Sequence, residues 1–107
     1  MSLEDKLEGI IARHQELGDT LANPEHIDSK DFPRISKEYS DLTAVVEVIT
    51  RYQEARTGIT ECEEIQADTD SDSEMKALAK DEQESLQKAL PEIEQALKIA
   101  LLPKDEA

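Results

Sequence analysis

Apolar residues recur at helical spacing over the first twenty positions of the chain. They follow one another at steps of three and four residues, with one histidine among them, at Leu3, Leu7, Ile10, His14, Leu17 and Leu21. Such steps predict an α-helix with one coiled-coil-like seam. Ser2 suits the N-cap, with Asp5 three residues later in the manner of a capping box. Asn23 stands before Pro24, and we expect the helix to end there because a residue before proline avoids helical angles.

A second periodic segment begins near Asp31, with Pro33 in the first turn, where its missing N–H does no harm. Gly58 disfavours a helix interior by about 1 kcal/mol relative to alanine, which leaves a bend at that point open. If unbroken, this helix of roughly 35 residues would span about 50 Å. Its apolar positions are Ile35, Tyr39, Leu42, Val46, Ile49, Tyr52, Ala55, Ile59, Cys62 and Ile65.

A polar, acidic break from Asp68 to Ser73 precedes a third helix. Asp72 and its two serine neighbours suit the N-cap, and Glu74 suits the positive end of the helix dipole. Pro91 lies inside the helical pattern and predicts either a kink or a split into two helices. The apolar positions of this segment are Met75, Leu78, Leu86, Leu90, Ile93, Leu97 and Leu101.

These three segments predict an all-α fold: an antiparallel three-helix bundle with two long helices and coiled-coil-like packing. Only three aromatic residues are present, so the core must be aliphatic. We expect residues 1–103 to form one helical domain and residues 104–107 to begin a linker. The apolar seams would hold the shape of the domain through Leu7, Leu17, Leu42, Ile49, Leu86, Ile93 and Leu97.

The acidic composition excludes several classes of partner. A formal net charge of −14 disfavours direct nucleic-acid binding, which needs Lys and Arg to replace counterions along the phosphates. The same charge disfavours anionic membrane surfaces, and no apolar run approaches the roughly 20 residues of a membrane-spanning helix. The acidic N-terminus lacks the pattern of a signal or transit peptide. A single cysteine fits a reducing compartment, so we expect a cytoplasmic location.

Three alternate aspartates resemble the start of an EF-hand calcium loop. They are Asp68, Asp70 and Asp72, but the sixth position is Ser73 where glycine is needed, and the twelfth is Ala79 where glutamate belongs. We therefore favour an acidic helix-capping turn. The alternative, a divalent-metal sensor, predicts a melting temperature that rises with calcium.

The histidines and the cysteine do not have the spacing of a zinc site. His14 falls on an apolar seam and is interpreted as a partly buried histidine with a hydrogen-bond partner. His26 lies in a predicted loop, facing solvent. Cys62 is interpreted as a buried or half-buried residue without chemistry, since its acidic neighbours would raise the thiol pKa. Those neighbours are Glu61, Glu63 and Glu64.

We predict no catalytic, cofactor-binding or metal-binding residue in this chain, and no enzyme activity. The glycines are isolated, so no phosphate-binding loop is present. Acid–base catalysis needs carboxylates held in a pocket, and a slim helical bundle offers few. The run Glu61–Glu74 contains seven acidic residues and no basic one. We favour a solvated helix end for this run, and a docking patch for a basic partner stays open.

Several stretches resemble bacterial class I peptide chain release factors. The segments Leu3–Leu7 and Arg13–Leu17 are similar to the opening helix of these factors, and Ser36–Leu42 is similar to their second helix. Leu101–Asp105 resembles the close of their N-terminal domain, in a form nearer to type 1 than to type 2. The resemblance covers essentially all 107 residues in the right order and implies an N-terminal helical module of a larger protein.

The resemblance implies a translation termination factor whose intact form reads UAA and UAG on the ribosome and directs peptidyl-tRNA hydrolysis. It implies contacts of this domain with the ribosomal stalk region or with the GTPase release factor. The family's Gly-Gly-Gln and Pro-x-Thr motifs have no counterpart in these residues. The alternative, from another class, is a stand-alone acidic coiled-coil adaptor that dimerises through the same seams.

Overall fold

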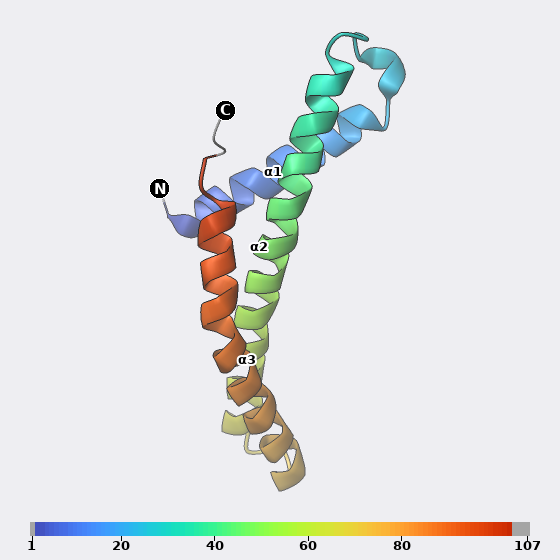
Figure 1. Cartoon of the computed structure of the whole chain (residues 1–107). Coiled ribbons are helices and arrows are strands. Elements are labelled where there is room, and N and C mark those ends of the chain that lie inside the picture. Colours follow the sequence, from blue (N-terminus) through green and yellow to red (C-terminus); the bar gives the residue numbers. More distant parts are fainter. Residues whose placement is uncertain (1, 104–107) are drawn as a thin grey trace. The chain divides into compact units, whose positions relative to one another are not determined.

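The structure, a computed structural model, describes residues 2–103 of the chain. The described residues form three α-helices and one short 3₁₀ helix, with no strand among them (Figure 1). This confirms the predicted all-α class, with three helices of which two are long. The expected linker at 104–107 lies outside the described residues. The elements are α1 (Leu3–Leu21), η1 (Pro24–His26), α2 (Phe32–Ala67) and α3 (Ser73–Ala100).

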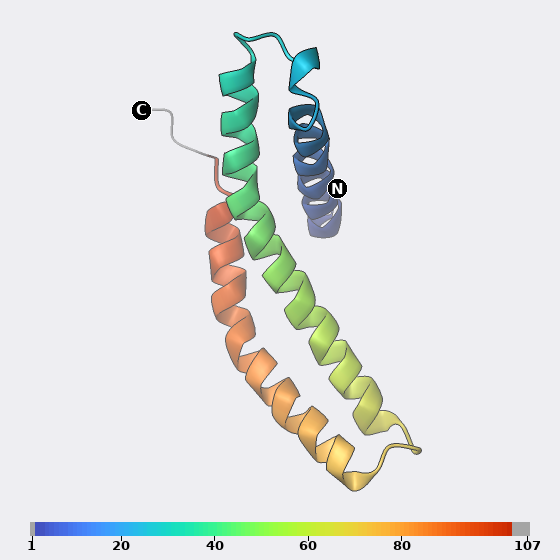
Figure 2. The same cartoon turned by 90° about the vertical axis from the view of Figure 1, so that its right-hand side faces the viewer.

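The chain divides into two compact units, Met1–Ile49 and Thr50–Ala107, and α2 contributes residues to both. In the first unit, α1 crosses the opening turns of α2 obliquely (Figure 1). In the second unit, the later turns of α2 and helix α3 form an antiparallel hairpin around the turn at 68–72 (Figure 2). No helix within residues 2–103 combines the length and the apolar character needed to cross a membrane.

The start of α1 follows the predicted capping box. The Asp5 backbone N–H donates to Ser2 Oγ at 3.1 Å, and the Ser2 backbone N–H donates to Asp5 Oδ2 at 3.4 Å. These two bonds satisfy donors that the first turn of a helix leaves without partners. The helix ends at Leu21, close to the predicted stop at Asn23 and Pro24.

Helix α2 begins at Phe32 with Pro33 as its second residue, as predicted, and continues unbroken for 36 residues. Gly58 does not interrupt it. The reason for a glycine there is the neighbouring helix: a Cβ at this position would lie 2.8 Å from Leu86 Cδ1 of α3. A contact that short does not occur between real Cβ and methyl groups, so α2 and α3 approach closely through Gly58.

Helix α3 is capped by Asp72, whose Oδ1 accepts the Met75 backbone N–H at 2.7 Å. Of the two outcomes predicted for Pro91, the split does not occur, because α3 continues through this residue to Ala100. Proline removes one N–H from the helix but has a φ that a helix accommodates. Ile93 and Leu97, both buried, anchor the turns that follow it.

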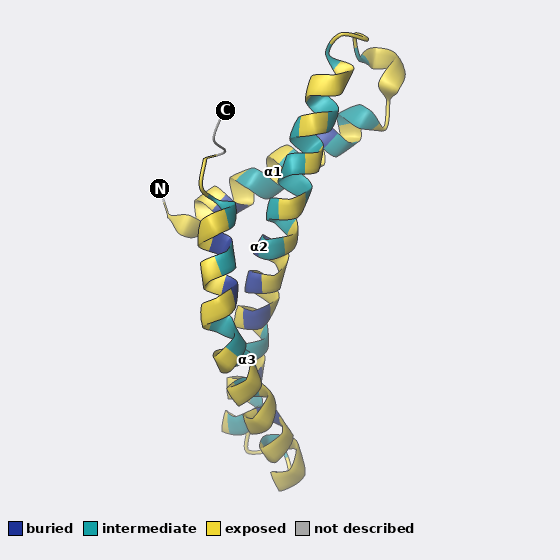
Figure 3. Ribbon diagram, in the orientation of Figure 1, coloured by how far each residue is buried: buried dark blue, intermediate teal, exposed yellow. Residues whose placement is uncertain are grey.

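Five of the seven seam residues predicted to hold the shape are buried, whereas Leu42 and Leu86 are half-buried. The buried residues lie mainly on the facing sides of the helices (Figure 3). The apolar pattern was wrong at Leu3, Met75 and Leu78, which are exposed. Near the start of α3 it is Ala79 that is buried, and the neighbouring Leu78 points about 100° away around the helix. The buried set comprises Leu7, Leu17, Ile49, Tyr52, Ala55, Cys62, Ala79, Ile93 and Leu97.

Two glycines of α1 give a matched test of this packing. Nothing lies within 4 Å of a Cβ built on Gly9, whereas a Cβ on Gly18 would lie 3.1 Å from Tyr39 Cε1. We expect Gly9→Ala to raise the free energy of unfolding by about 0.5–1 kcal/mol through helix propensity alone. Gly18→Ala should give no such gain, because the Tyr39 ring is held by a stacking partner. Urea unfolding followed by circular dichroism measures both, and equal stabilisation by the two substitutions would contradict this packing.

Candidate functional site

The first unit is organised around a polar cluster between α1 and α2. His14 of α1 stacks on the Tyr39 ring, with centroids 4.4 Å apart and planes 10° from parallel. His14 Nε2 also lies 2.8 Å from Thr43 Oγ1. This confirms the interpretation of His14 as a partly buried histidine with a partner. Both partners were missed, although Tyr39 and Thr43 stand four residues apart on one side of α2, a spacing that places them side by side.

The hydrogen bonds of Thr43 fix the proton on His14. Thr43 Oγ1 donates its one proton to the Tyr39 backbone carbonyl at 2.8 Å. Its oxygen must therefore accept from His14, so Nε2 carries a proton. An imidazole held with Nε2 as donor offers a neighbour neither a free base nor a metal ligand at that atom. The role of His14 here is to join α1 to α2.

Beside this cluster, Arg13 and Glu38 form a two-point ion pair. Arg13 Nε lies 2.8 Å from Glu38 Oε2, and Arg13 Nη2 lies 3.0 Å from Glu38 Oε1. The hydrogen bonds and charge of Arg13 lower the pKa of Glu38. A lowered pKa means that the pair stabilises the fold above the ordinary pKa of glutamic acid and loses that contribution as the pH falls through the lowered value. The direction is opposite to the one that a general acid at neutral pH needs.

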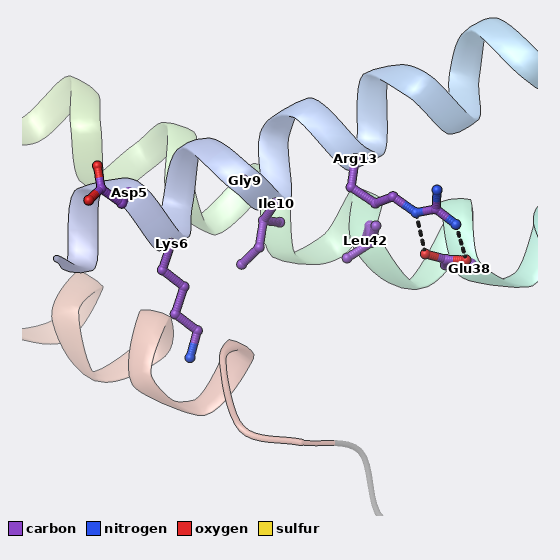
Figure 4. Close-up of a pocket in the computed structure, with 7 residues that line it drawn as sticks. All are labelled: Asp5, Lys6, Gly9, Ile10, Arg13, Glu38 and Leu42. Carbon is purple, nitrogen blue, oxygen red and sulfur yellow. Dashed lines mark hydrogen bonds and ion pairs between the residues drawn. The ribbon is translucent and has the colours of Figure 1, made fainter. Parts of the chain in front are cut away.

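The Arg13–Glu38 pair closes one end of a shallow groove between α1 and α2 (Figure 4). Ile10 and Leu42 lie between this pair and Lys6, so the middle of the groove is apolar. The groove has few polar groups that converge, unlike the small-molecule sites of enzymes. Its lining comprises Asp5, Lys6, Gly9, Ile10, Arg13, Glu38 and Leu42.

In the second unit, Cys62 is buried against α3. Its Sγ lies 3.8 Å from Oε2 of Glu82, a neighbour that sequence reasoning did not predict. Burial, the Glu82 carboxylate and Glu61 together raise the pKa of the Cys62 thiol. The predicted direction is therefore right, with burial as the main cause. A buried thiol with a raised pKa is a poor nucleophile.

The acidic turn before α3 has the predicted capping geometry. Asp68 Oδ1 accepts the Asp70 backbone N–H at 2.9 Å, and Asp72 caps α3. No three His, Cys, Asp or Glu side chains within residues 2–103 are placed to hold a metal ion. His26, predicted to face solvent, is 79% exposed. Within the same residues, every buried side-chain nitrogen or oxygen has a hydrogen-bond partner.

Together these features define an all-α module whose polar groups cap, pair and pack helices. The PCRF domain family matches residues 10–107, and the chain belongs to this family. It is 39% identical over 107 residues to peptide chain release factor 1 of Wolbachia pipientis subsp. Culex pipiens, covering 99% of this chain and 30% of that protein.

Other relatives give the same result. Peptide chain release factor 1 of Anaplasma marginale strain Florida is 39% identical over 106 residues, covering 99% of this chain and 30% of the relative. Peptide chain release factor 1 of Magnetococcus marinus is 39% identical over 106 residues, covering 98% of this chain and 29% of that protein. The chain thus spans about 30% of the length of the curated relatives that it matches. No solved structure matches it.

The polar cluster can be tested at Thr43. Thr43→Val removes the acceptor of a half-buried imidazole N–H and should lower the free energy of unfolding by about 1–3 kcal/mol. Thr43→Ser keeps the hydroxyl and should recover most of this loss. Thr60→Val is the matched control, because the exposed Thr60 makes the same kind of bond, to the Arg56 carbonyl at 3.2 Å, with no histidine attached. Equal losses for Thr43→Val and Thr60→Val in urea unfolding would show that the His14 contact contributes nothing.

The state of Cys62 predicts slow thiol chemistry. At pH 8 the folded chain should react with an aromatic disulfide reagent far more slowly than the urea-unfolded chain, because the thiol is buried and its pKa is raised. The rate in the folded state should also begin to rise at a higher pH than that of a free cysteine, whose pKa is about 8.5. The reaction is followed by the absorbance of the aromatic thiolate that the reagent releases. Equal rates for the folded and unfolded chains would refute the burial of this side chain.

Proposed function

We propose that this chain is the N-terminal helical domain of a bacterial peptide chain release factor of type 1, acting in translation termination. The observation that supports this most directly is the PCRF match over residues 10–107. Relatives named peptide chain release factor 1 align with 98–99% of the chain, as one continuous region. The intact protein would recognise UAA and UAG on the ribosome and direct hydrolysis of peptidyl-tRNA.

The domain itself would position the factor and make protein contacts, rather than perform chemistry. The 107 residues contain no adjacent glycines, and none of the four prolines has a threonine two positions later. His14 is held between α1 and α2, and Cys62 is buried against α3. The exposed His26 belongs to no group of metal-ligating side chains within residues 2–103. Contacts with the ribosomal stalk region or with the GTPase release factor fit an acidic helical surface, because a net charge of −14 suits basic protein surfaces better than RNA.

A domain exchange tests this role. Residues 1–107 would replace the matching segment of the Wolbachia pipientis release factor 1, and peptide release would be measured over many turnovers on ribosomes stalled at UAA. The GTPase release factor would be present. We expect the chimera to release peptide at the rate of the parent. The parent without this segment should release peptide more slowly. A chimera that performs no better than the shortened parent would overturn the proposal.

The adaptor alternative predicts a different state in solution. An adaptor that dimerises through its apolar seams should sediment as a stable dimer at all accessible concentrations. The proposed appendage should sediment as a monomer, since the seams are used within each unit. Sedimentation equilibrium of the 107-residue chain separates the two, and a concentration-independent dimer would favour the adaptor.

A further inference from the structure

The second unit carries a groove whose lining is polar and acidic. It runs along α2 over Thr50, Thr57 and Gly58 and is bordered by Glu82 of α3. Gly58 lies in this lining, where Leu86 of α3 occupies the place that a side chain would take. No lysine or arginine lines the groove. The lining residues are Thr50, Gln53, Glu54, Thr57, Gly58, Glu61 and Glu82.

The carboxylates of this groove are spread along the helix rather than gathered at one point. Glu54 and Glu61 are seven residues apart, which corresponds to about 10.5 Å along α2. Neither forms an ion pair with another described residue, and within residues 2–103 these side chains do not form a cluster that could hold a metal ion. Negative charges separated in this way are complementary to several lysine or arginine side chains spaced along one partner.

Two exposed apolar side chains extend the same side of α3. Met75 is 50% exposed and Leu78 is 65% exposed, although both belong to the helical pattern. Met75, Leu78 and Glu82 are spaced three and then four residues apart, so they lie in one row on the helix. Glu82 borders the groove, and the row therefore continues the groove as an apolar strip. Methionine adapts well to different apolar partners.

We propose that this surface of the second unit, defined by Glu54, Glu61, Met75, Leu78 and Glu82, binds a basic amphipathic helix of a protein partner. Charge complementarity selects the partner: its lysines or arginines would face the three carboxylates. Its apolar face would cover Met75 and Leu78, which alone form too small a patch for a stable dimer of this chain. The inference rests on the surface alone and goes beyond the proposed role in termination.

The test uses the 107-residue chain and a labelled peptide of about 18 residues, five helical turns, with leucines on one face and lysines beside them. Fluorescence anisotropy measures its Kd at low salt. We expect the pair Glu54→Gln and Glu61→Gln to raise Kd about fivefold or more. The matched control pair Glu92→Gln and Glu94→Gln makes the same change of charge on exposed positions of α3 outside the surface, and should leave Kd within twofold, or about 0.4 kcal/mol.

A second comparison tests the apolar strip. Leu78→Ser should weaken binding by at least about threefold, whereas Ile99→Ser, at a similarly exposed residue of α3, should not. A peptide of the same composition, with its leucines scattered around the helix, should bind more weakly than the amphipathic one. Equal affinity for the two peptides, or equal effects of the surface and control variants, would mean that only net charge attracts the peptide and would overturn the proposal. Because binding is measured without ribosomes, the result is independent of the release assay.

Discussion

The apolar side of α2 is the constraint on which both units depend, because this one helix supplies a wall to each. Ile49 closes the first unit, and Tyr52, Ala55 and Cys62 belong to the second. With few aromatic residues available, the core is a narrow and mainly aliphatic seam, in which each fully buried leucine or isoleucine contributes about 1.5–3 kcal/mol. A seam this narrow leaves little room for a pocket. The acidic side chains stay outside it, where water and counterions solvate them.

Polar contacts fix the register of the helices, because the apolar seam alone would allow one helix to shift along another. In the first unit, the His14 contacts with Tyr39 and Thr43 fix the height of α1 against α2. In the second, Gln66 bonds to Gln83 while Cys62 contacts Glu82, both across the hairpin. Such buried or half-buried bonds are costly to leave unmade, so they favour one register over its neighbours. The structure thus uses its few inward polar groups to align the helices.

Sequence reasoning succeeded where the relevant physics is local. The caps at Ser2 and Asp72, and the entry of α2 at Pro33, depend on residues within one turn of each other. It failed where the outcome depends on what lies across the helix. Leu78 has the same place in the apolar pattern as its buried counterparts, yet it faces solvent. Pro91 carries a local penalty, but packing on either side keeps α3 in one piece.

The sequence by itself determined the all-α class, the approximate starts of the helices, the acidic character and the family resemblance, because each follows from short-range periodicity, composition or motif. Only the tertiary structure decided which glycine is held by a neighbour, which ring His14 stacks on, and that Glu82 lies beside Cys62. It also decided which apolar residues stay exposed beside the acidic groove. These facts depend on the rotation and register of one helix against another, and many registers satisfy the same apolar repeat.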